Sequence, residues 1–372
     1  MTPEDRERLT RIGRQFQVPG EFHDGHRIKI GHINETFAAT YLHFEMPFRV
    51  VHQTVNTHVF RDPEGLMRNV VRVTEHLRRR LVWNGTDQIP RRVLQAVPAR
   101  DGKFFHIDGD GVFWRTFIFV PDVRSYDAVE TPRQAYQAGF AFGEFQSFLA
   151  DLPASLLTPT IPDFHHTPKR FQRLQQAIAR DEYNRGRLAR KEIEFAESMA
   201  DCVSRLVDAE ARGEVPVRVT HNDTKFNNVL LDEQTGDAMC VVDLDTVMPG
   251  LILYDFGDMV RTTTSRTAED EVYLDRVELE IPMFEALLKG YLTAARSFLT
   301  PSERSLLVFS GKLLTFTIGI RFLTDYLEGD QYFRIHREHH NLDRCRKQFR
   351  LIESIMEKED EMEALVEKLW EA

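Results

Sequence analysis

The sequence predicts an α+β fold of two lobes, a small β-rich lobe over residues 1–120 and a large, mainly helical lobe over residues 121–372. Three observations support this division. Short apolar segments alternate with turn residues through the first third of the chain, as strands do. Pro121-Asp122 ends that pattern, and long stretches with helical periodicity follow it. The length of 372 residues is enough for two lobes that each bury a sizeable core.

The first lobe contains a clear hairpin signal, the turn Asp108-Gly109-Asp110-Gly111 between two apolar segments. Asp-Gly at such a turn is typical of a β-hairpin. The segment that follows, residues 112–120, is apolar on both faces, which predicts a covered strand. A helix is expected from Pro63 to about Arg80, because apolar residues recur there at helical spacing. Further strands are expected at residues 26–30, 36–44 and 48–55.

The second lobe is expected to consist mainly of helices, interrupted by a short β-rich stretch around residues 219–243. The most apolar helical stretch, around residues 306–323, carries Lys312 and Arg321, which predicts a buried helix and not a membrane span. The stretches with helical periodicity are residues 131–152, 168–181, 187–212, 282–298, 303–327 and 342–370.

Composition excludes several classes of protein. With 48 Lys and Arg against 58 Asp and Glu, the formal charge is −10, which argues against a nucleic-acid partner. The cysteines Cys202, Cys240 and Cys345 lie far apart, so neither a disulfide framework nor a Cys-rich zinc site is expected. The charged N-terminal segment has no apolar stretch of the signal-peptide kind. We therefore expect a cytoplasmic protein, monomeric and without a membrane partner.

The segment after residue 219 carries the chemistry. His221, Asp223, Lys225 and Asn228 follow the spacing H-x-D-x-K-x-x-N between two short apolar strands. That spacing matches the catalytic loop of phosphoryl-transferring kinases, where Asp orients the acceptor hydroxyl and takes its proton and Asn binds a metal. Lys225 is placed to meet the oxygens of the transferring phosphoryl group. The sequence therefore predicts a bilobal protein-kinase-like fold with ATP as phosphoryl donor and His221 in a supporting role.

The strand that returns from this loop offers the metal ligands. If the hairpin centres on Thr235-Gly236, Asn228 and Asp243 face each other and can share one Mg²⁺. Asp245 lies two residues further on, hence on the same strand face if the strand stays extended. Asp245 is either a ligand of a second Mg²⁺ or a cap or salt-bridge partner.

Asp255-Phe256-Gly257 spells the metal-binding motif of protein kinases, but we expect a different role for it. Asp255 is too far from Asn228 for a simple hairpin, and Pro249-Gly250 breaks the chain between them. A carboxylate before a helix commonly accepts hydrogen bonds from backbone N–H groups. Asp255 is therefore predicted to support the catalytic loop, with direct metal ligation as the alternative.

These motifs resemble the aminoglycoside phosphotransferase and choline kinase family, whose loop H-x-D-x-x-x-x-N precedes an I-D-x-[DE] strand. Within that family the chain is similar to the N-acetylhexosamine 1-kinases. The likeness extends over nearly the whole chain. Its narrowest blocks are Asp243-Leu244-Asp245-Thr246-Val247-Met248-Pro249-Gly250, residues 321–330 and, in the small lobe, residues 31–36 and 66–70.

The resemblance implies an ATP- and Mg²⁺-dependent kinase, with one or two Mg²⁺, that phosphorylates the anomeric hydroxyl of an N-acetylhexosamine. The residues it places near the sugar are His32, Asp223, Arg261, Thr262 and Arg321, and those it places near the nucleotide are Gly31, Asn34 and Gln53.

The chain departs from expected patterns at three places. The relatives carry an aromatic residue where Thr262 stands, the first loop is poor in glycine, and residues 49–53 lack the lysine of typical kinases. An acceptor other than an N-acetylhexosamine (another sugar, an aminoglycoside, choline or homoserine) remains the alternative within the same fold. A non-enzymatic binding protein is a further hypothesis, although the proton acceptor and the metal ligands are all present.

Overall fold

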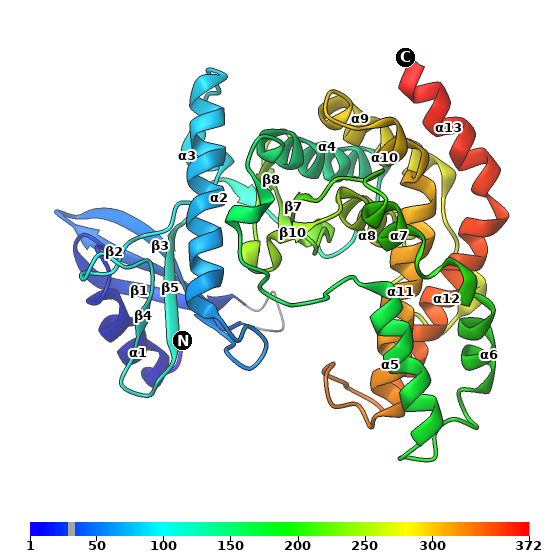
Figure 1. Ribbon diagram of the computed structural model, residues 1–372. Coiled ribbons are helices and arrows are strands. Elements are labelled where there is room, and N and C mark those ends of the chain that lie inside the picture. The colour runs from blue at the N-terminus through cyan, green and yellow to red at the C-terminus, as the bar shows by residue number, and fades with distance from the viewer. Residues whose placement is uncertain (29–33, 372) are drawn as a thin grey trace.

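A five-stranded antiparallel sheet forms the first lobe of the computed structural model, which describes residues 1–28 and 34–371 (Figure 1). The strand order is β1-β2-β3-β5-β4. The turn at residues 108–111 joins β4 to β5, as the sequence predicted. The strands of this sheet are β1 (Glu21–Ile28), β2 (Thr36–His43), β3 (Met46–Val55), β4 (His106–Ile107) and β5 (Phe113–Ile118).

One helix covers each face of this sheet. Helix α1 (Pro3–Gly13) packs on the face that carries Trp114, and α2 (Pro63–Trp83) packs on the face that carries Phe113 and Phe117. Successive side chains of a strand point to opposite faces, so Arg115 of β5 points to the α2 side. The predicted helix from Pro63 is confirmed by α2, and the predicted covered strand by β5, which is almost completely buried.

A histidine is buried on the α1 side of the sheet. His52 Nε2 lies 2.9 Å from Tyr41 Oη, and His52 Nδ1 lies 2.8 Å from Thr116 Oγ1. Burial lowers the pKa of His52 to about 3. The folded protein therefore keeps this imidazole neutral at a pH where the unfolded chain protonates it.

Acidification should consequently destabilise the first lobe. Between pH 6.5 and 3 the unfolded chain binds a proton at His52 that the folded chain does not, so stability falls as the pH falls below about 6.5. At pH 5 the expected cost is about 2 kcal/mol. His52→Gln should flatten the pH dependence of the melting temperature between pH 7 and 5, whereas His26→Gln, at an exposed position, should not. Equal slopes for wild type and His52→Gln would contradict this account.

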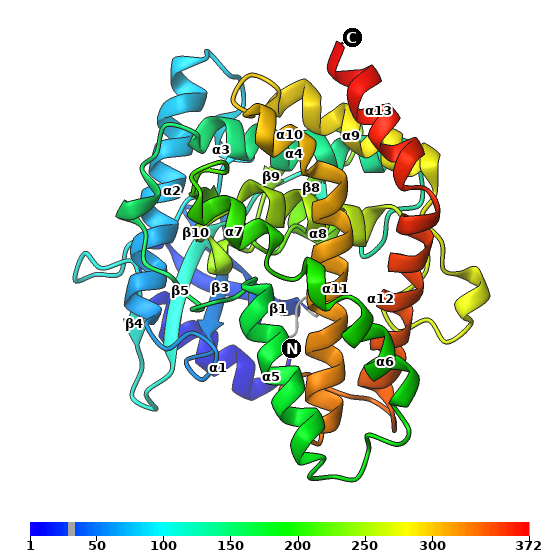
Figure 2. The ribbon, with the colours of Figure 1, turned by 45° about the vertical axis from the view of Figure 1, so that its right-hand side comes forward.

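The second lobe is built around α11, which lies between α5 and α12 in both views (Figures 1 and 2). Its helices are α4 (Pro132–Leu149), α5 (Thr167–Arg180), α6 (Arg190–Ser198), α7 (Arg205–Ala211), α8 (Ile252–Thr263), α9 (Ile281–Ala295), α10 (Pro301–Ser305), α11 (Leu307–Leu327), α12 (His340–Glu357) and α13 (Glu359–Glu371). The expected helix over 187–212 is wrong as one piece, because α6 and α7 are separated by a 3₁₀ turn at Ala200–Cys202.

Helix α11 is a core helix. Among the described residues it is the one helix long and apolar enough to cross a membrane, and 89% of its apolar window is buried inside the protein. Helices α4 and α9 approach each other closely because of their glycines. A Cβ atom on Gly139 would lie 2.1 Å from the carbonyl oxygen of Leu287, and one on Gly290 would lie 2.0 Å from that of Tyr136.

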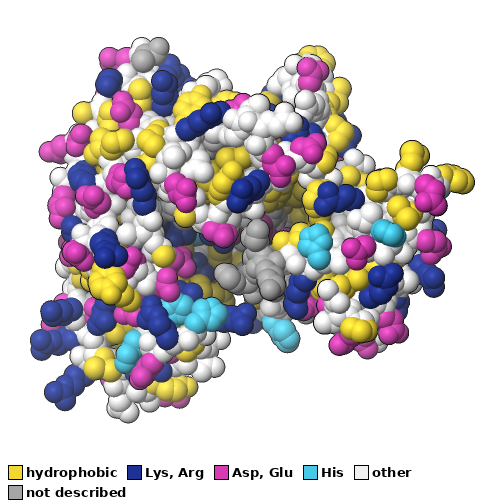
Figure 3. All heavy atoms as spheres, turned by 180° about the vertical axis from the view of Figure 1, so that it is seen from behind, with side chains coloured by type: hydrophobic (Ala, Val, Ile, Leu, Met, Phe, Trp, Pro, Cys, Tyr) yellow, Lys and Arg dark blue, Asp and Glu magenta, His cyan; other side chains and the backbone are white. Residues whose placement is uncertain are grey.

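The two lobes share an apolar core. Leu66 and Val70 of α2 belong to the same buried cluster as Phe145 of α4 and Val247. The predicted boundary at residue 120 marks the change from mainly strands to mainly helices, but this cluster crosses it. As a boundary between independent domains it stays a prediction. Elsewhere the surface is hollowed between the lobes, as the space-filling view shows (Figure 3).

Asn69 of α2 makes the polar part of this junction. Its Nδ2 donates to the backbone oxygens of Thr158 at 2.7 Å and Val247 at 3.0 Å, and its Oδ1 accepts from the backbone nitrogen of Thr158 at 2.9 Å. Helix α2 is therefore fixed to the chain of the second lobe by a side chain that is itself buried.

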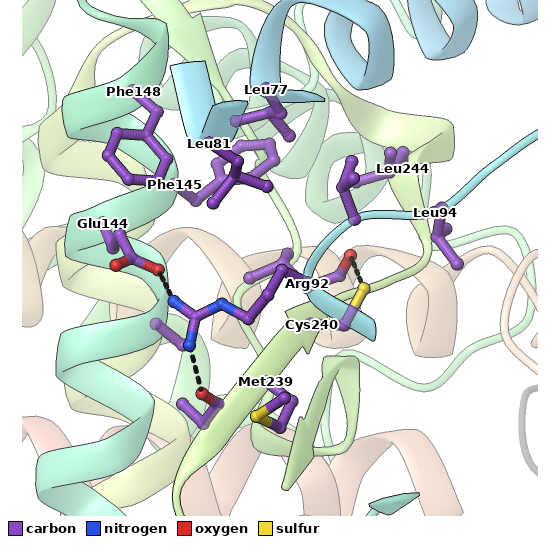
Figure 4. Close-up of a pocket in the computed structure, with 14 residues that line it drawn as sticks. Leu77, Leu81, Arg92, Leu94, Glu144, Phe145, Phe148, Met239, Cys240 and Leu244 are labelled. Carbon is purple, nitrogen blue, oxygen red and sulfur yellow. Dashed lines mark hydrogen bonds and ion pairs between the residues drawn. The ribbon is translucent and has the colours of Figure 1, made fainter. Parts of the chain in front are cut away.

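A small cavity lies within this shared core, between α2, α4 and β9 (Ala238–Val241) (Figure 4). Leu77 and Phe145 line it, and Arg92, the last residue of the short helix α3 (Ile89–Arg92), pairs there with Glu144. Its volume of about 30 Å³ has room for about two water molecules and is far too small for a nucleotide. The nucleotide therefore cannot bind in this cavity.

Candidate active site

The predicted catalytic loop joins β7 (Arg218–Thr220) to β8 (Val229–Asp232). Two small sheets hold its ends: β7 pairs with β10 (Met248–Gly250), and β8 pairs with both β9 and β6 (Val123–Arg124). Because β6 follows directly after the first lobe, the connection between the lobes is attached to the hairpin that carries the loop.

Asp223, Lys225 and Asn228 lie in contact within the loop. Lys225 Nζ is 3.0 Å from Asp223 Oδ2, and Asn228 Nδ2 donates to that oxygen at 3.3 Å and to the backbone oxygen of Asp223 at 2.9 Å. The carboxylate of Asp223 raises the pKa of Lys225, so its ammonium group stays charged. Asp223 Oδ1 accepts no hydrogen bond from the described residues and is the oxygen left for an acceptor hydroxyl. Asn228 Oδ1 is the amide atom left for a cation.

Asp255, at the start of α8, holds the backbone of the loop. Its Oδ2 accepts from His221 N at 2.9 Å and from Gln146 Nε2 at 2.8 Å, and its Oδ1 accepts from Asn222 N at 2.6 Å. Burial raises the pKa of Asp255 above its ordinary value. Three donors thus surround a fully buried carboxylate, which is the kind of contact predicted for a residue that supports the loop.

The imidazole of His221 is fixed from both sides. Its Nε2 lies 3.0 Å from the carbonyl oxygen of Val242, and its Nδ1 accepts from the backbone nitrogen of Asp223 at 3.3 Å. These partners require the proton on Nε2. The rings of Phe142 and Phe145 pack edge-on against the imidazole. His221 therefore connects the catalytic loop, the returning strand and α4, and does not face a substrate.

Asp258 is a second support that the sequence did not single out. Its Oδ2 accepts from the backbone nitrogen of Thr224 at 2.9 Å, and its Oδ1 accepts from Arg261 Nε at 2.8 Å. Its position three residues after Asp255 on α8 is a signal that could have found it, because residues so spaced share a helix face. Arg261 also pairs with Glu269 and is only 6% exposed, so the structure places this predicted sugar contact inside the protein. Both carboxylates satisfy its guanidinium there.

The predicted alignment of Asn228 with Asp243 is wrong by one residue. Val242 N donates to the backbone oxygen of Asn228 at 2.9 Å, and the pairing of β8 with β9 shifts between Leu230 and Leu231. Asp243 has a left-handed backbone with φ of 61° and begins a 3₁₀ turn. Asp245 lies within that turn, so the two carboxylates do not lie along one extended strand face as the sequence suggested.

Asp243 is nevertheless placed in an excess of negative charge. Burial, Asp245 and Asp223 together raise its pKa to about 7, against the opposing charges of Lys225 and Arg115. Within the described residues no three His, Cys, Asp or Glu side chains form a preformed metal site. Mg²⁺ usually takes one or two carboxylates and completes its shell with water and substrate phosphates. The oxygens of Asp243 and Asn228 fit such a shared site.

Asp245 forms an ion pair between the lobes. Arg115 Nη1 lies 2.5 Å from Asp245 Oδ1, and Asn34 Nδ2 donates to Asp245 Oδ2 at 2.7 Å. Gln53 Oε1 accepts from Arg115 Nε at 3.0 Å and Nη2 at 2.7 Å, and Gln53 Nε2 donates to Thr36 Oγ1. Of the two roles left open by the sequence, the salt bridge is the one this structure displays. Asn34 and Gln53, the predicted nucleotide contacts, both belong to this network.

Arg115 is a site residue that the sequence alone did not single out. A single cation inside the otherwise apolar segment 113–119 was the signal that could have revealed it. Its partner in the second lobe could not be read from spacing, because 130 residues separate Arg115 from Asp245 along the chain. The predicted contacts Gly31 and His32 lie outside the described residues.

Arg321, a predicted sugar contact, lies within electrostatic reach of Asp223. The guanidinium of Arg321 on α11 stacks near three aromatic rings, at 5.0 Å from Phe164, 5.8 Å from Tyr332 and 5.4 Å from Phe333. Burial lowers its pKa, and Asp223 is close enough to oppose that shift. The hydroxyl of Thr262 donates to backbone oxygens of its own helix.

A sheet lobe joined to a helical lobe, with the Asp-Lys-Asn loop at the hairpin, defines a kinase-like phosphotransferase. Two solved structures share this fold along nearly their whole lengths. The spectinomycin phosphotransferase APH(9)-Ia, solved with ADP and spectinomycin, is 12% identical with a TM-score of 0.56 over 96% of this chain and 99% of that chain. The choline kinase of Cryptosporidium parvum is 14% identical with a TM-score of 0.52 over 98% and 99%. The predicted fold class is confirmed.

The sequence pattern of the phosphotransferase enzyme family (APH) matches residues 24–289, which include most of the sheet and the whole catalytic loop. The chain belongs to this family.

Proposed function

We propose that this phosphotransferase uses ATP and Mg²⁺ to phosphorylate the anomeric hydroxyl of an N-acetylhexosamine, which gives a sugar 1-phosphate. The observation that carries the phosphoryl transfer is the geometry at Asp223, where Lys225 and Asn228 occupy one carboxylate oxygen and the other remains for the acceptor. The choice of sugar rests on the resemblance of residues 243–250 and 321–330 to the N-acetylhexosamine 1-kinases.

In the proposed reaction Asp223 accepts the proton of the C1 hydroxyl while that oxygen forms a bond to the γ-phosphorus. The bond from phosphorus to the bridging oxygen breaks, and ADP leaves with the electron pair. Lys225 holds a positive charge beside Asp223, where it can stabilise the oxygens of the transferring group. Asn228 and Asp243 would hold Mg²⁺, which when bound neutralises charge on the phosphates.

The charge on the acceptor side favours a neutral sugar over a cationic acceptor. Arg321 lies within electrostatic reach of Asp223, and Arg170 is close enough to Arg321 that burial and this like charge lower the pKa of Arg170 to about 10. Choline carries a permanent positive charge, and spectinomycin carries amines that are protonated at neutral pH. The guanidinium group of Arg321 would repel either acceptor, whereas sugar hydroxyls can accept hydrogen bonds from it.

An acceptor screen tests this proposal. Purified enzyme with ATP and Mg²⁺ is offered N-acetylglucosamine, N-acetylgalactosamine, glucose, homoserine, choline and spectinomycin in turn, and ADP release is measured. Asp223→Asn enzyme serves as the blank for contaminating kinases. We expect the highest kcat/KM with an N-acetylhexosamine and a phosphorus NMR signal coupled to the proton on C1.

Turnover confined to choline or spectinomycin would refute the sugar assignment while leaving the phosphotransferase intact. Phosphorylation of the sugar at another hydroxyl would refute the anomeric position alone.

A further inference from the structure

Strand β3 lacks the phosphate-binding lysine of protein kinases. In those enzymes a β3 lysine meets the nucleotide phosphates, and a carboxylate on the following helix holds that lysine in place. Here β3 contains no lysine, and the predicted nucleotide contact Gln53 carries an uncharged amide. A neutral amide cannot offset the charge of a nucleoside polyphosphate, and Arg49, the cation that β3 does carry, stacks on Phe119 four residues before Gln53.

Arg115 lies beside the vacant lysine position. β3 pairs with β5 so that Gln53 and Arg115 are direct partners, and both side chains point to the α2 side of the sheet. Gln53 Oε1 binds Nε and Nη2 of the guanidinium, which fixes its plane. A buried arginine so held from behind presents Nη1 toward the second lobe.

The Nη1 end of the guanidinium group has an imperfectly aligned partner. Nη1 makes an ion pair with Asp245 Oδ1, yet this oxygen has no well-aligned hydrogen bond, and the other neighbour of Nη1 is the sulfur of Met67 at 4.0 Å. Both side chains of the pair are almost fully buried. A buried donor and acceptor that meet by charge alone retain capacity for a better partner.

Arg115 also lies at the phosphate end of the site. Its partner Asp245 lies two residues after Asp243 in the same 3₁₀ turn, and Asp243 with Asn228 is the proposed metal position. Three carboxylates, those of Asp223, Asp243 and Asp245, face two cations there. Metal and phosphate would enter together, and the phosphates would bring acceptor oxygens that guanidinium groups bind in pairs.

We propose that Arg115 is the nucleotide-phosphate ligand of the first lobe: it pairs with Asp245 in the nucleotide-free enzyme and donates to a polyphosphate oxygen of the bound nucleotide, in place of the missing β3 lysine. This inference rests on the nucleotide donor of the proposed function. In this enzyme the phosphate contact would be the guanidinium group of an arginine on β5. In protein kinases it is the ammonium group of a lysine on β3.

A double-mutant comparison separates this role from a purely structural one. Wild type, Arg115→Gln, Asp245→Asn and the double variant are compared by calorimetry for binding of ADP and of adenosine, without Mg²⁺ so that metal ligation does not contribute. We expect Arg115→Gln to weaken ADP by about ten-fold or more, because a lost hydrogen bond to a charged group has that size, and to leave adenosine unchanged.

The comparison in the Asp245→Asn background distinguishes phosphate binding from a structural role of Arg115. In this background position 245 has no carboxylate that the loss of Arg115 could leave unpaired. If Arg115 binds phosphate, the double variant loses the same factor in ADP affinity relative to Asp245→Asn. If Arg115 only holds Asp245, the two proteins bind ADP equally, and the inference is overturned. Equal losses of affinity for ADP and for adenosine would overturn the inference as well.

A lysine at the usual strand position provides a gain-of-function test. Gln53→Lys added to Arg115→Gln should restore much of the ADP affinity, since it returns a cation to the same face of the sheet. No recovery would count against a phosphate contact here. Wild-type enzyme that binds neither ADP nor adenosine would instead refute the nucleotide donor, a failure distinguishable from that of Arg115.

Discussion

Replacing Asp223 with Asn should reduce kcat by about 10²–10⁴-fold, the range that general-base removal produces. The substitution keeps the shape of the side chain and removes the charge that takes the acceptor proton. Lys225 loses its ion-pair partner at the same time, so the transferring group would also be less well positioned. Turnover with ATP and the best acceptor, measured by ADP release, checks the prediction.

Asp237→Asn is the matched control, because it makes the same change on an exposed carboxylate of the same hairpin. It should keep wild-type turnover. ADP binding should survive in both variants, since neither change is placed at the adenosine. Wild-type turnover by Asp223→Asn would show that another group takes the proton.

Asp255→Asn should lower both stability and kcat without a direct effect on the metal. The carboxylate accepts from two backbone N–H groups and from Gln146, and an amide would turn its own NH₂ toward one of these donors. A buried donor left without a partner costs about 1–3 kcal/mol, and the loop that carries Asp223 would lose its fixed geometry. Melting temperature and kcat are the measurements.

The dependence of rate on Mg²⁺ concentration separates this role from direct ligation. If Asp255 supports the catalytic loop, Asp255→Asn should have a lower kcat but an unchanged half-saturating Mg²⁺ concentration. If Asp255 instead binds Mg²⁺ directly, the variant should need a much higher Mg²⁺ concentration and should show little change in melting temperature. Gln146→Leu combined with Tyr291→Phe is a graded comparison, because it removes one donor to Asp255 together with the buried hydroxyl that donates to Gln146, and it leaves both backbone contacts. It should cost less than Asp255→Asn.

Local signals were enough for most elements of the fold. The Asp-Gly turn located the β4–β5 hairpin, and helical spacing located α2 and α4. Spacing failed over residues 187–212, where no proline or glycine marks the break. The break falls at the 3₁₀ turn Ala200–Cys202, where the chain passes from the buried cluster that contains Ala196 to the one that contains Leu206.

The candidate active site shows the same difference between local signals, which the sequence displays, and tertiary contacts, which it does not. The residues of one loop, from His221 to Asn228, were predictable because their spacing alone brings them together. The alignment of Asp243 was not, because a shift of register within the hairpin moved it by one residue. Arg115 could be noticed in its strand, but its pairing with Asp245 depends on how the lobes meet, which no local pattern encodes.

The anchoring of α2 limits how the two lobes can move relative to each other. In protein kinases the corresponding helix moves, and activation consists largely of bringing it into position. Here Asn69 fastens α2 to backbone at Thr158 and Val247, and its apolar side lies in the shared core. A movement of α2 relative to the second lobe would therefore have to break the hydrogen bonds of Asn69 and open the shared apolar core.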